Sequence, residues 1–317
     1  MTVVIPTRDR RRLLMRTLTS VLAQVDVPLH VLVVDDGSTD GTADAVDALH
    51  SPAVSLVRHE QSLGVSRARN SGLADADTPF VAFTDDDDLW APTKLRDQLA
   101  GLDSFPAARW SCTDAVHIDG RLHVITYAEA PPSGDVAAVM TRRMAVPGGG
   151  SGVLVRTSLA RCVGGFDPDF SILADWDFYL RLALCSPVAA VHAPLVGYYV
   201  HADSMYHDPL GLADELDRLR QKYSHPVPLC SGSRIRRVQF SPDLPRWYVR
   251  SAAMAYAQGD VRAALRILRD GARSAGGWSI AGRLLGRIVR RAGRRLGTAP
   301  DEGAPARWVP FEKWPHV

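Results

Sequence analysis

Short apolar runs alternate with helical repeats along the first hundred residues. The runs that predict strands are short and rich in β-branched or aromatic residues, and they lie at 3–5, 29–34, 54–57 and 80–83. The stretches that predict helices carry apolar residues on one face or follow capping residues, and they end at residues 23, 49, 73 and 102. Strands that alternate with helices predict an α/β fold with a mostly parallel central sheet.

The pattern changes further along the chain. Residues 108–205 mix one helix, at 175–185, with strands near 109–112, 122–126, 151–155 and 188–200. A proline and three glycines at 147–150 predict a flexible loop within this region. Beyond about residue 210 the periodicity becomes helical, and it is lost in the tail. We therefore expect an α/β domain, a helical appendage and an irregular tail, at 1–208, 209–297 and 298–317.

The composition is that of an ordinary globular protein, with 46% hydrophobic and 23% charged residues among 317. The formal net charge of +2 gives no case for nucleic-acid binding. No run reaches the apolar length of a membrane span, and the chain opens on a strand-like run rather than a leader pattern. We therefore expect a cytoplasmic protein, or one that is peripheral on the inner membrane face.

The four cysteines stand at positions 112, 162, 185 and 230, without the paired spacing of a zinc site. A free cysteine in a reducing compartment is usually a small, buried, apolar residue. We therefore expect buried free thiols at all four positions.

A basic amphipathic segment spans 280–296. Its arginines at 283, 287, 290 and 294 fall on one helical face, with apolar residues mostly opposite. Helices of this kind bind anionic membrane surfaces, so peripheral membrane contact through 280–296 is one hypothesis. A helix that packs on the domain and exposes its basic face to water is the alternative. Glycines at 282, 286 and 293 weaken the helix in either case.

The carboxylates of Asp85–Asp88 directly follow an apolar run and Thr84. Carboxylates this close together repel and raise one another's pKa, so a bound cation favours their ionised form. Hard oxygen ligands select Mg²⁺ or Mn²⁺, and Mg²⁺ commonly bridges a carboxylate and substrate phosphates. Most charge runs are solvated loops, but the position after a buried strand favours a metal site here.

Further polar residues gather where predicted strands end. Thr7 and Asp9 follow the first strand, and Asp35 and Asp36 follow the second. Ligands of open α/β sheets bind at the carboxyl ends of strands, so we expect these residues near the acidic run. The Asp35-Asp36 segment lacks the glycine spacing of a dinucleotide site. A contact with a base or ribose and a simple capping turn therefore both remain open.

Charged pairs mark two predicted helices. Arg67 and Arg69 are two positions apart, so one can face the site while the other pairs elsewhere. Asp175 and Asp177 lie where a loop becomes a helix, which stabilises a carboxylate as the anion. A carboxylate in that position is more often a cap than a catalytic base, so its role is open on this evidence.

Six segments form an ordered series of motifs. They are Ile5-Pro-Thr-Arg-Asp-Arg, Val34-Asp-Asp-Gly-Ser-Thr-Asp-Gly-Thr, Gly64-Val-Ser-Arg-Ala-Arg-Asn-Ser-Gly, Phe83-Thr-Asp-Asp-Asp-Asp-Leu-Trp, Gly164-Gly-Phe-Asp and Asp175-Trp-Asp-Phe-Tyr-Leu-Arg-Leu. The series resembles glycosyltransferase family 2, a family of inverting, nucleotide-sugar-dependent enzymes with the GT-A fold. Each motif is weak by itself, whereas six in the family's order are specific. The resemblance covers about residues 1–205.

The resemblance implies a role for each matching residue. The donor nucleotide would be bound by Thr7, Asp9, Asp35, Asp36, Arg67, Arg69, Asp85 and Asp86. Asp87, in the family's DxD motif, would bind Mg²⁺ or Mn²⁺, and His201 resembles a tail-motif histidine near the metal or diphosphate. A purely structural role for His201 is the alternative. Asp175 would be the general base. Ala174 departs from the family, which usually has a second acid there, and a shifted register would make Asp177 the base instead.

The resemblance thus implies a hexosyltransferase-like enzyme that moves a sugar from a nucleotide-diphosphate sugar to an acceptor hydroxyl in surface glycan or glycoconjugate synthesis. Glycan, lipid-linked, peptide and small-metabolite acceptors all remain open. A nucleotidyltransferase is one alternative, but its glycine-rich loop is missing after the first strand, where Thr7-Arg-Asp-Arg contains no glycine. A membrane-associated, non-catalytic scaffold of the same fold is another. Retention of the acidic residues argues against the scaffold.

Overall fold

The computed structural model describes residues 1–201, 209–228, 230, 235–236, 238–242, 248–249, 252 and 261–274. The strands of the main sheet are β1 (Thr2–Thr7), β2 (His30–Asp35), β3 (Val54–Arg58), β4 (Phe80–Phe83), β5 (Leu89–Trp90), β6 (Trp110–Ile118), β7 (Val124–Ala128), β8 (Val153–Arg156) and β9 (Val188–Tyr199). The helices are α1 (Arg11–Leu22), α2 (Thr42–Asp47), α3 (Val65–Asp75), α4 (Lys94–Ser104), α5 (Ala137–Met140), α6 (Thr157–Cys162), α7 (Ala174–Cys185), α8 (Pro209–Tyr223) and α10 (Val261–Ser274).

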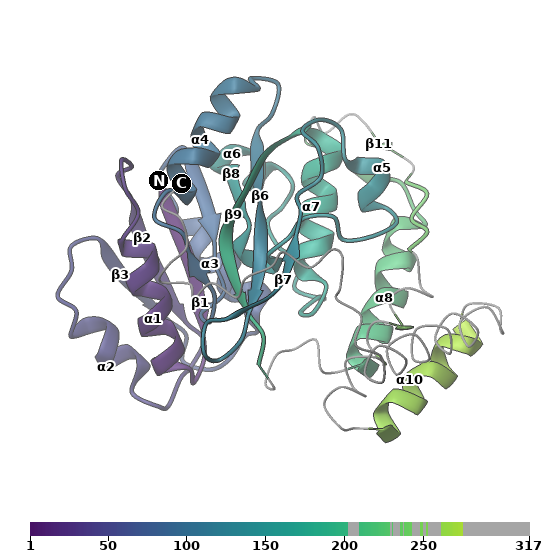
Figure 1. The fold of residues 1–317 in the computed structure, drawn as a ribbon, viewed down its shortest axis with the longest axis horizontal. Coiled ribbons are helices and arrows are strands. Elements are labelled where there is room, and N and C mark those ends of the chain that lie inside the picture. Colours follow the sequence, from purple (N-terminus) through teal and green to yellow (C-terminus); the bar gives the residue numbers. More distant parts are fainter. Residues whose placement is uncertain are drawn as a thin grey trace, which may run out of the picture.

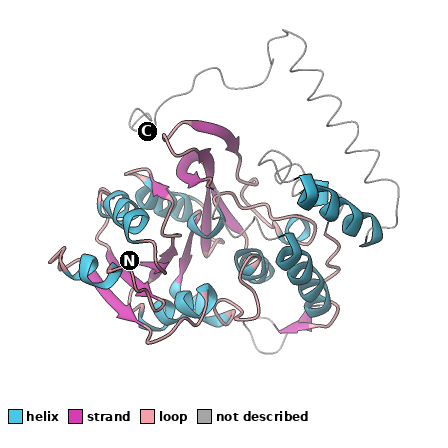
Figure 2. Cartoon of the chain, turned by 90° about the horizontal axis from the view of Figure 1, so that it is seen from below, coloured by secondary structure: helices cyan, strands magenta, loops and turns pink. Residues whose placement is uncertain are grey.

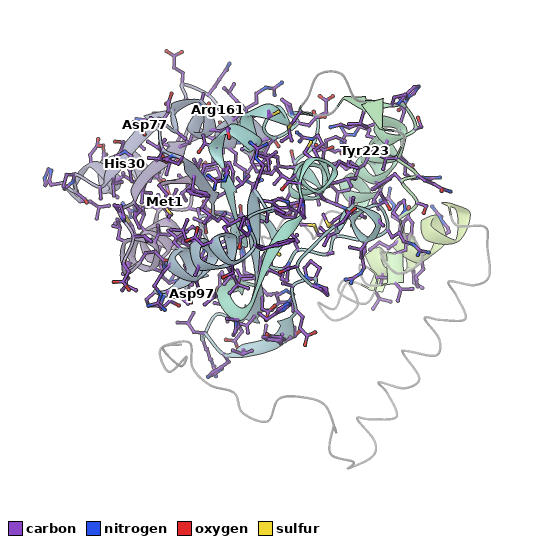
Figure 3. The ribbon with its side chains drawn as sticks, turned by 90° about the horizontal axis from the view of Figure 1, so that it is seen from above. Met1, His30, Asp77, Asp97, Arg161 and Tyr223 are labelled. Carbon is purple, nitrogen blue, oxygen red and sulfur yellow. The ribbon has the colours of Figure 1, made fainter. Side chains whose placement is uncertain are left out.

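The first part of the sheet is the parallel α/β arrangement that the sequence predicts. Strands β3, β2, β1 and β4 lie in that order, and each runs parallel to its neighbour. At the carboxyl ends of β1 and β2, Thr7 pairs with Asp35. Met1, His30 and Asp77, at or near the starts of β1, β2 and β4, lie together on one side of the molecule (Figure 3). The carboxyl ends of these strands therefore meet at the opposite edge.

The rest of the sheet is mixed. Strand β8 runs antiparallel to both β4 and β6, while β6 runs parallel to β9. The short β5 and the edge strand β7 pair antiparallel with β9 and β6. The expectation of a mostly parallel sheet therefore fails beyond β4. An apolar run indicates a buried strand, but its direction is set by how the chain returns to the sheet, which the run does not encode.

Helices cover both faces of the sheet (Figures 1 and 2), and each face has its own hydrophobic core. Side chains alternate along a strand, so Val3 and Ile5 of β1 pack with α1, α2 and α4, whereas Val4 packs with α3, α6 and α7. On α1, Leu14 and Leu18 are buried four residues apart on the face that meets the sheet. These helices hold the loops at the strand ends in place.

Helix α8, which the sequence assigns to the appendage, packs against the α/β domain beside α7 (Figure 1). Leu212, Leu216 and Leu219 belong to the same core as Trp176 of α7. A two-stranded sheet of β10 (Val227–Pro228) and β11 (Ile235–Arg236) follows, and then α10. The segment 280–296 and the tail 298–317 lie outside the described residues. Among the helices that are described, none combines the length and apolar character that a bilayer crossing requires.

The cysteines differ in exposure. Cys112 in β6 is buried, as expected, but Cys162 is exposed and Cys185 and Cys230 are half-buried. Cys162 and Cys185 are the last residues of α6 and α7, and helix ends lie close to the surface. The prediction of buried free thiols is therefore correct for Cys112 alone.

Candidate functional site

A cavity of about 390 Å³ opens at the carboxyl ends of β1, β2 and β4. Most of the residues that the sequence singles out line it, and they are Thr7, Asp36, Arg69, Asp85, Asp86, Asp87 and Asp175. They come from the end of β1, from the loops after β2 and β4, and from helices α3 and α7. The topology therefore brings distant segments of the chain to one place, as the rule for strand ends predicts.

Two carboxylates of the acidic run are held by the protein's own donors. Asp88 accepts hydrogen bonds from the Ser151 hydroxyl at 2.5 Å and from the Tyr199 backbone N–H at 2.9 Å. Asp86 accepts one from the Thr7 hydroxyl at 2.7 Å. Burial, together with the charge of Asp87, raises the pKa of Asp86 to about 7 and that of Asp88 well above its usual range. These two residues therefore shape the loop around Asp87.

Asp87 contacts two basic side chains, of which Arg10 lines the cavity and His201 does not. Its Oδ2 lies 2.8 Å from His201 Nε2, beyond the end of β9, and 2.8 Å from Arg10 Nη1, just before α1. The same Arg10 nitrogen lies 3.2 Å from Asp86 Oδ1. Arg10 thus supplies positive charge to the acidic run, at the place where the sequence predicts a cation.

The residues around Asp87 suit a divalent ion that takes its remaining ligands from the substrate. Within the described residues, no three histidine, cysteine, aspartate or glutamate side chains come together as a ready-made metal site. The contact of a carboxylate and an imidazole, Asp87 and His201, provides an oxygen and a nitrogen donor side by side. Mg²⁺ is usually bound through one or two carboxylates together with phosphates and water, so this small donor set suits Mg²⁺ or Mn²⁺ that arrives with a diphosphate.

Arg69 links the acidic run to Asp175. The guanidinium is buried on α3 and forms a short ion pair with Asp85, and its charge also acts on Asp175. Asp175, in the first turn of α7, is buried, and its Oδ1 accepts the Trp176 N–H at 2.7 Å. Burial raises the pKa of Asp175 to about 6, with the positive charge of Arg69 opposing the shift and the charge of Asp85 adding to it.

The glycine loop at 148–150 is packed into the cavity wall, unlike the flexible loop that the sequence predicts. Gly148 and Gly149 have φ values of 74° and 50°, which favour glycine, and a 3₁₀ turn covers Gly149–Ser151. A Cβ on Gly150 would lie 2.6 Å from Arg69 Nη2 and 2.9 Å from Asp85 Oδ1. The glycines therefore allow the backbone to approach the Arg69–Asp85 pair closely.

Asp36 organises the loop after β3 at another wall of the cavity. Its Oδ1 meets His59 Nδ1 at 2.7 Å and the Leu63 N–H at 2.8 Å. Its Oδ2 accepts from the Ser62 hydroxyl at 2.7 Å and from the Gly64 N–H at 2.9 Å. Burial opposes ionisation, but these hydrogen bonds lower the pKa of Asp36 to about 2. The carboxylate is therefore an anion that already holds several protein donors.

Three of the residues assigned to nucleotide binding do not line the cavity. Asp9 is exposed and accepts the Thr39 N–H at 2.7 Å. Asp35 is buried on β2, where it accepts the Ser38 N–H at 2.8 Å. Arg67 is exposed and donates to the Leu63 carbonyl at 3.3 Å. Arg69 faces the cavity and Arg67 does not, as the spacing along the helix predicts.

Asp177, the alternative base, is enclosed between α7 and α8. It is fully buried, and its Oδ2 lies 2.6 Å from Arg181 Nη2. Its Oδ1 lies 2.7 Å from Lys222 Nζ and 3.0 Å from the Tyr223 hydroxyl. Asp177 is not among the residues that line the cavity. Its carboxylate is engaged in the packing of the two helices, which leaves Asp175 as the acid of this motif that reaches the cavity.

The sequence pattern misses several residues of the site. Arg10 lies only three residues after the end of β1, so the rule for strand ends, applied to cations as well as acids, could have found it. Tyr198 of β9 lines the cavity, and Ser151 holds Asp88. Ser151 also accepts the Asp85 N–H at 3.0 Å. A tyrosine in a strand and a serine after glycines give no signal of this kind in the sequence.

The architecture and the cavity define a GT-A type glycosyltransferase fold. A mannosyltransferase from Pyrobaculum calidifontis, in complex with GDP-Man and Mn²⁺, superposes with a TM-score of 0.54 at 22% identity, over 94% of this chain and 80% of that chain. Residues 2–122 match the family model "Glycosyl transferase family 2". This part of the chain is a glycosyltransferase family 2 domain, which confirms the resemblance noted in the sequence.

Curated relatives share the same N-terminal part. The succinoglycan biosynthesis protein ExoO of Rhizobium meliloti is 36% identical over 118 residues, which are 37% of this chain and 34% of that protein. The UDP-Glc:alpha-D-GlcNAc-diphosphoundecaprenol beta-1,3-glucosyltransferase WfgD of Escherichia coli is 32% identical over 98 residues, or 31% of this chain and 39% of that protein. The alignments thus span little more than a third of these relatives' length.

Proposed function

We propose that this chain transfers a hexose from a nucleoside-diphosphate sugar to an acceptor hydroxyl, with inversion at the anomeric carbon. The observation that carries the proposal is that Asp87 and Asp175, from distant segments of the chain, line the same cavity. One cavity then holds an acidic group suited to a diphosphate-bound cation and a separate carboxylate suited to proton removal. A single displacement needs only that one carboxylate beside the sugar, unlike the paired carboxylates of glycosidases.

In the proposed reaction Asp175 accepts the proton of the acceptor hydroxyl as its oxygen attacks the anomeric carbon. The bond from that carbon to the diphosphate oxygen breaks in the same step, and the nucleoside diphosphate leaves. A general base works best when its pKa lies near the working pH, and burial raises the pKa of Asp175 to about 6. The Trp176 N–H, which donates to Oδ1, fixes the orientation of the carboxylate.

The protein's cations and the acidic loop would serve the leaving group. Arg69, held by Asp85 at the cavity wall, directs positive charge toward the space between Asp85 and Asp175. Arg10 offers a second cation beside Asp87. When bound, Mg²⁺ or Mn²⁺ held by Asp87 and His201 would neutralise charge on the diphosphate, which is worth several kcal/mol in such reactions.

We propose a nucleoside-diphosphate hexose as donor, bound with its base near Thr7 and Asp36 and its diphosphate near Asp85–Asp87. Because Asp36 already binds His59, Ser62 and two backbone N–H groups, its main contribution would be a rigid wall for the nucleoside. For the acceptor we propose a hydroxyl of a surface glycan or its lipid-linked precursor. The names of two relatives, a succinoglycan biosynthesis protein and a transferase acting on a diphosphoundecaprenol-linked sugar, support this class.

A substitution at Asp175 tests the proposal. With Mn²⁺ present, UDP- and GDP-hexoses are screened for release of nucleoside diphosphate, and the active donor is then used to compare wild type with Asp175→Asn. We expect a loss of about 10²- to 10⁴-fold in transfer, with binding of UDP or GDP retained in calorimetry. Arg67→Gln, an exposed position outside the cavity, is the matched control and should keep wild-type transfer. Near-full turnover by Asp175→Asn would refute its role as the base.

The products separate this proposal from its enzymatic rival. A glycosyltransferase releases a nucleoside diphosphate, whereas a nucleotidyltransferase releases pyrophosphate. Release of pyrophosphate from a sugar phosphate and a nucleoside triphosphate would refute the present proposal in favour of a nucleotidyltransferase.

Binding of full-length protein to anionic vesicles at low salt tests membrane contact through 280–296 separately, since that contact is compatible with catalysis.

A further inference from the structure

Glu215 of helix α8 reaches the loop that leads into α7. Its Oε1 accepts the Ser171 N–H at 2.9 Å, and its Oε2 accepts the Leu173 N–H at 2.8 Å. The Glu215 side chain is 6% exposed. Its contact with Leu173 is buried, whereas its contact with Ser171, an exposed residue, is partly buried. Ser171 lies in the cavity wall, and Leu173 is two residues before Asp175. One carboxylate thus holds both the wall of the cavity and the start of the helix that carries Asp175.

The start of α7 has no cap of its own. Its N-cap residue is Leu173, whose side chain has no hydrogen-bond acceptor, and no side-chain cap bond is formed there. Glu215 places a negative charge at this end of the helix, where the helix dipole favours an anion. A buried backbone N–H must be paired, so the Leu173 N–H depends on Glu215, which also accepts the partly buried Ser171 N–H.

Helix α8 is fixed firmly enough for Glu215 to act in this way. Lys222 Nζ lies 2.7 Å from both Asp167 and Asp177, and the Tyr223 hydroxyl lies 3.0 Å from Asp177 Oδ1. Tyr223 is turned into the interior among the helices (Figure 3). Ion pairs and a shared core therefore attach α8 to α7 and to the segment before it.

We propose that Glu215 is a positioning residue that sets Asp175 for catalysis, so that α8 is part of the catalytic unit rather than of an appendage. The inference rests on the proposed function of Asp175. Glu215 acts through the backbone of 171–173 and does not itself reach the cavity, because it is absent from the lining residues. A small shift of a reacting group can cost about 100-fold in rate. Glu215 can therefore affect the rate through the position of Asp175 without contacting the substrate.

The test compares Glu215→Gln with Glu215→Asp in the full chain. The amide of Gln can accept only one of the two N–H bonds, and Asp is one methylene too short to reach both. We expect kcat for transfer to fall about 10- to 100-fold per folded protein, while the affinity for UDP and GDP measured by calorimetry stays at the wild-type value. Asp217→Asn, an exposed position on the same helix, is the control and should change neither quantity.

Hydrogen exchange in the wild-type protein provides a second measurement that does not depend on activity. We expect slow exchange at the Ser171 and Leu173 amides, and faster exchange at both in Glu215→Gln. Rapid exchange in wild type, or wild-type kcat in a folded Glu215→Gln, would overturn the inference. If wild type transfers no sugar from any donor, the proposed function fails instead. If Asp175→Asn is inactive and both Glu215 variants are fully active, only the role of Glu215 fails.

Discussion

Asp87 Oδ2 lies 2.8 Å from His201 Nε2 and so joins the loop after β4 to the chain just beyond β9, 114 residues later. The pair sits at the edge where the parallel strands end, next to Arg10. A carboxylate and an imidazole in contact either hydrogen-bond to each other or serve as two ligands of a shared cation. A titration with metal decides between these alternatives.

Removal of divalent metal should abolish transfer. We expect no turnover in excess chelator and recovery on addition of Mn²⁺ or Mg²⁺, because the departing diphosphate needs its charge neutralised. In His201→Gln we expect a higher Mn²⁺ concentration for half-maximal rate, with turnover at saturating Mn²⁺ reduced less than in Asp87→Asn. Metal titrations of the three proteins measure both quantities. Full activity of wild type in chelator would remove the metal role of Asp87 and His201.

The rate of transfer should rise with pH through about 6. Asp175 must be unprotonated to accept a proton, and its pKa is raised to about 6, so kcat/KM should fall about tenfold per pH unit below that value. The stability that Asp175 contributes changes with pH in the opposite direction to the rate. A carboxyl with a raised pKa keeps its proton longer when folded, so stability from this group declines as pH rises from about 4 to about 6. A pH profile of kcat/KM that is flat between about 5 and 8 would contradict the assignment.

Gly150→Ala should disturb the Arg69–Asp85 pair. The added Cβ would lie 2.6 Å from Arg69 Nη2, so the guanidinium must move. Crowding of this kind costs about 1–3 kcal/mol, and we expect about tenfold or greater loss of nucleotide affinity or rate. Gly101→Ala in α4 is the control, since its Cβ would meet only Val191, at 3.1 Å and outside the cavity. Equal activity of the two variants would show that the close approach of Gly150 has no role.

Much of the site follows from one rule about parallel strands. Because their carboxyl ends share one edge, the positions of Thr7, Asp36 and the acidic run just after apolar runs are enough to predict that they lie together. Asp35 and Asp36 illustrate a second rule. Side chains alternate in an extended chain, so only one of the pair can face the cavity, and the structure selects Asp36. Applied to the sequence alone, this alternation already predicts that only one of Asp35 and Asp36 faces the cavity.

The rest depends on contacts between distant parts of the chain. Glu215 lies 42 residues beyond Leu173, and nothing in the periodicity of α8 indicates which loop its carboxylate meets. The direction of β8 likewise depends on how the glycine turn returns the chain to the sheet. Local patterns predicted the helices and strands of the first hundred residues except the short β5, whereas these pairings are decided by three-dimensional packing.

Asp177→Asn should weaken the packing of α8 on α7 and lower the stability of the protein, without removing a group that takes part in the reaction. Asp177 is fully buried and pairs with Arg181 and Lys222, so neutralising it leaves Arg181 without its carboxylate partner, while Lys222 keeps Asp167. Breaking a buried ion pair in this way costs about 3–5 kcal/mol, and we expect a clearly lower midpoint of urea unfolding. Asp217→Asn, whose side chain is 71% exposed in its pair with Arg220, should leave the midpoint unchanged. An Asp177→Asn variant that keeps wild-type stability but loses transfer would instead identify Asp177 as the base.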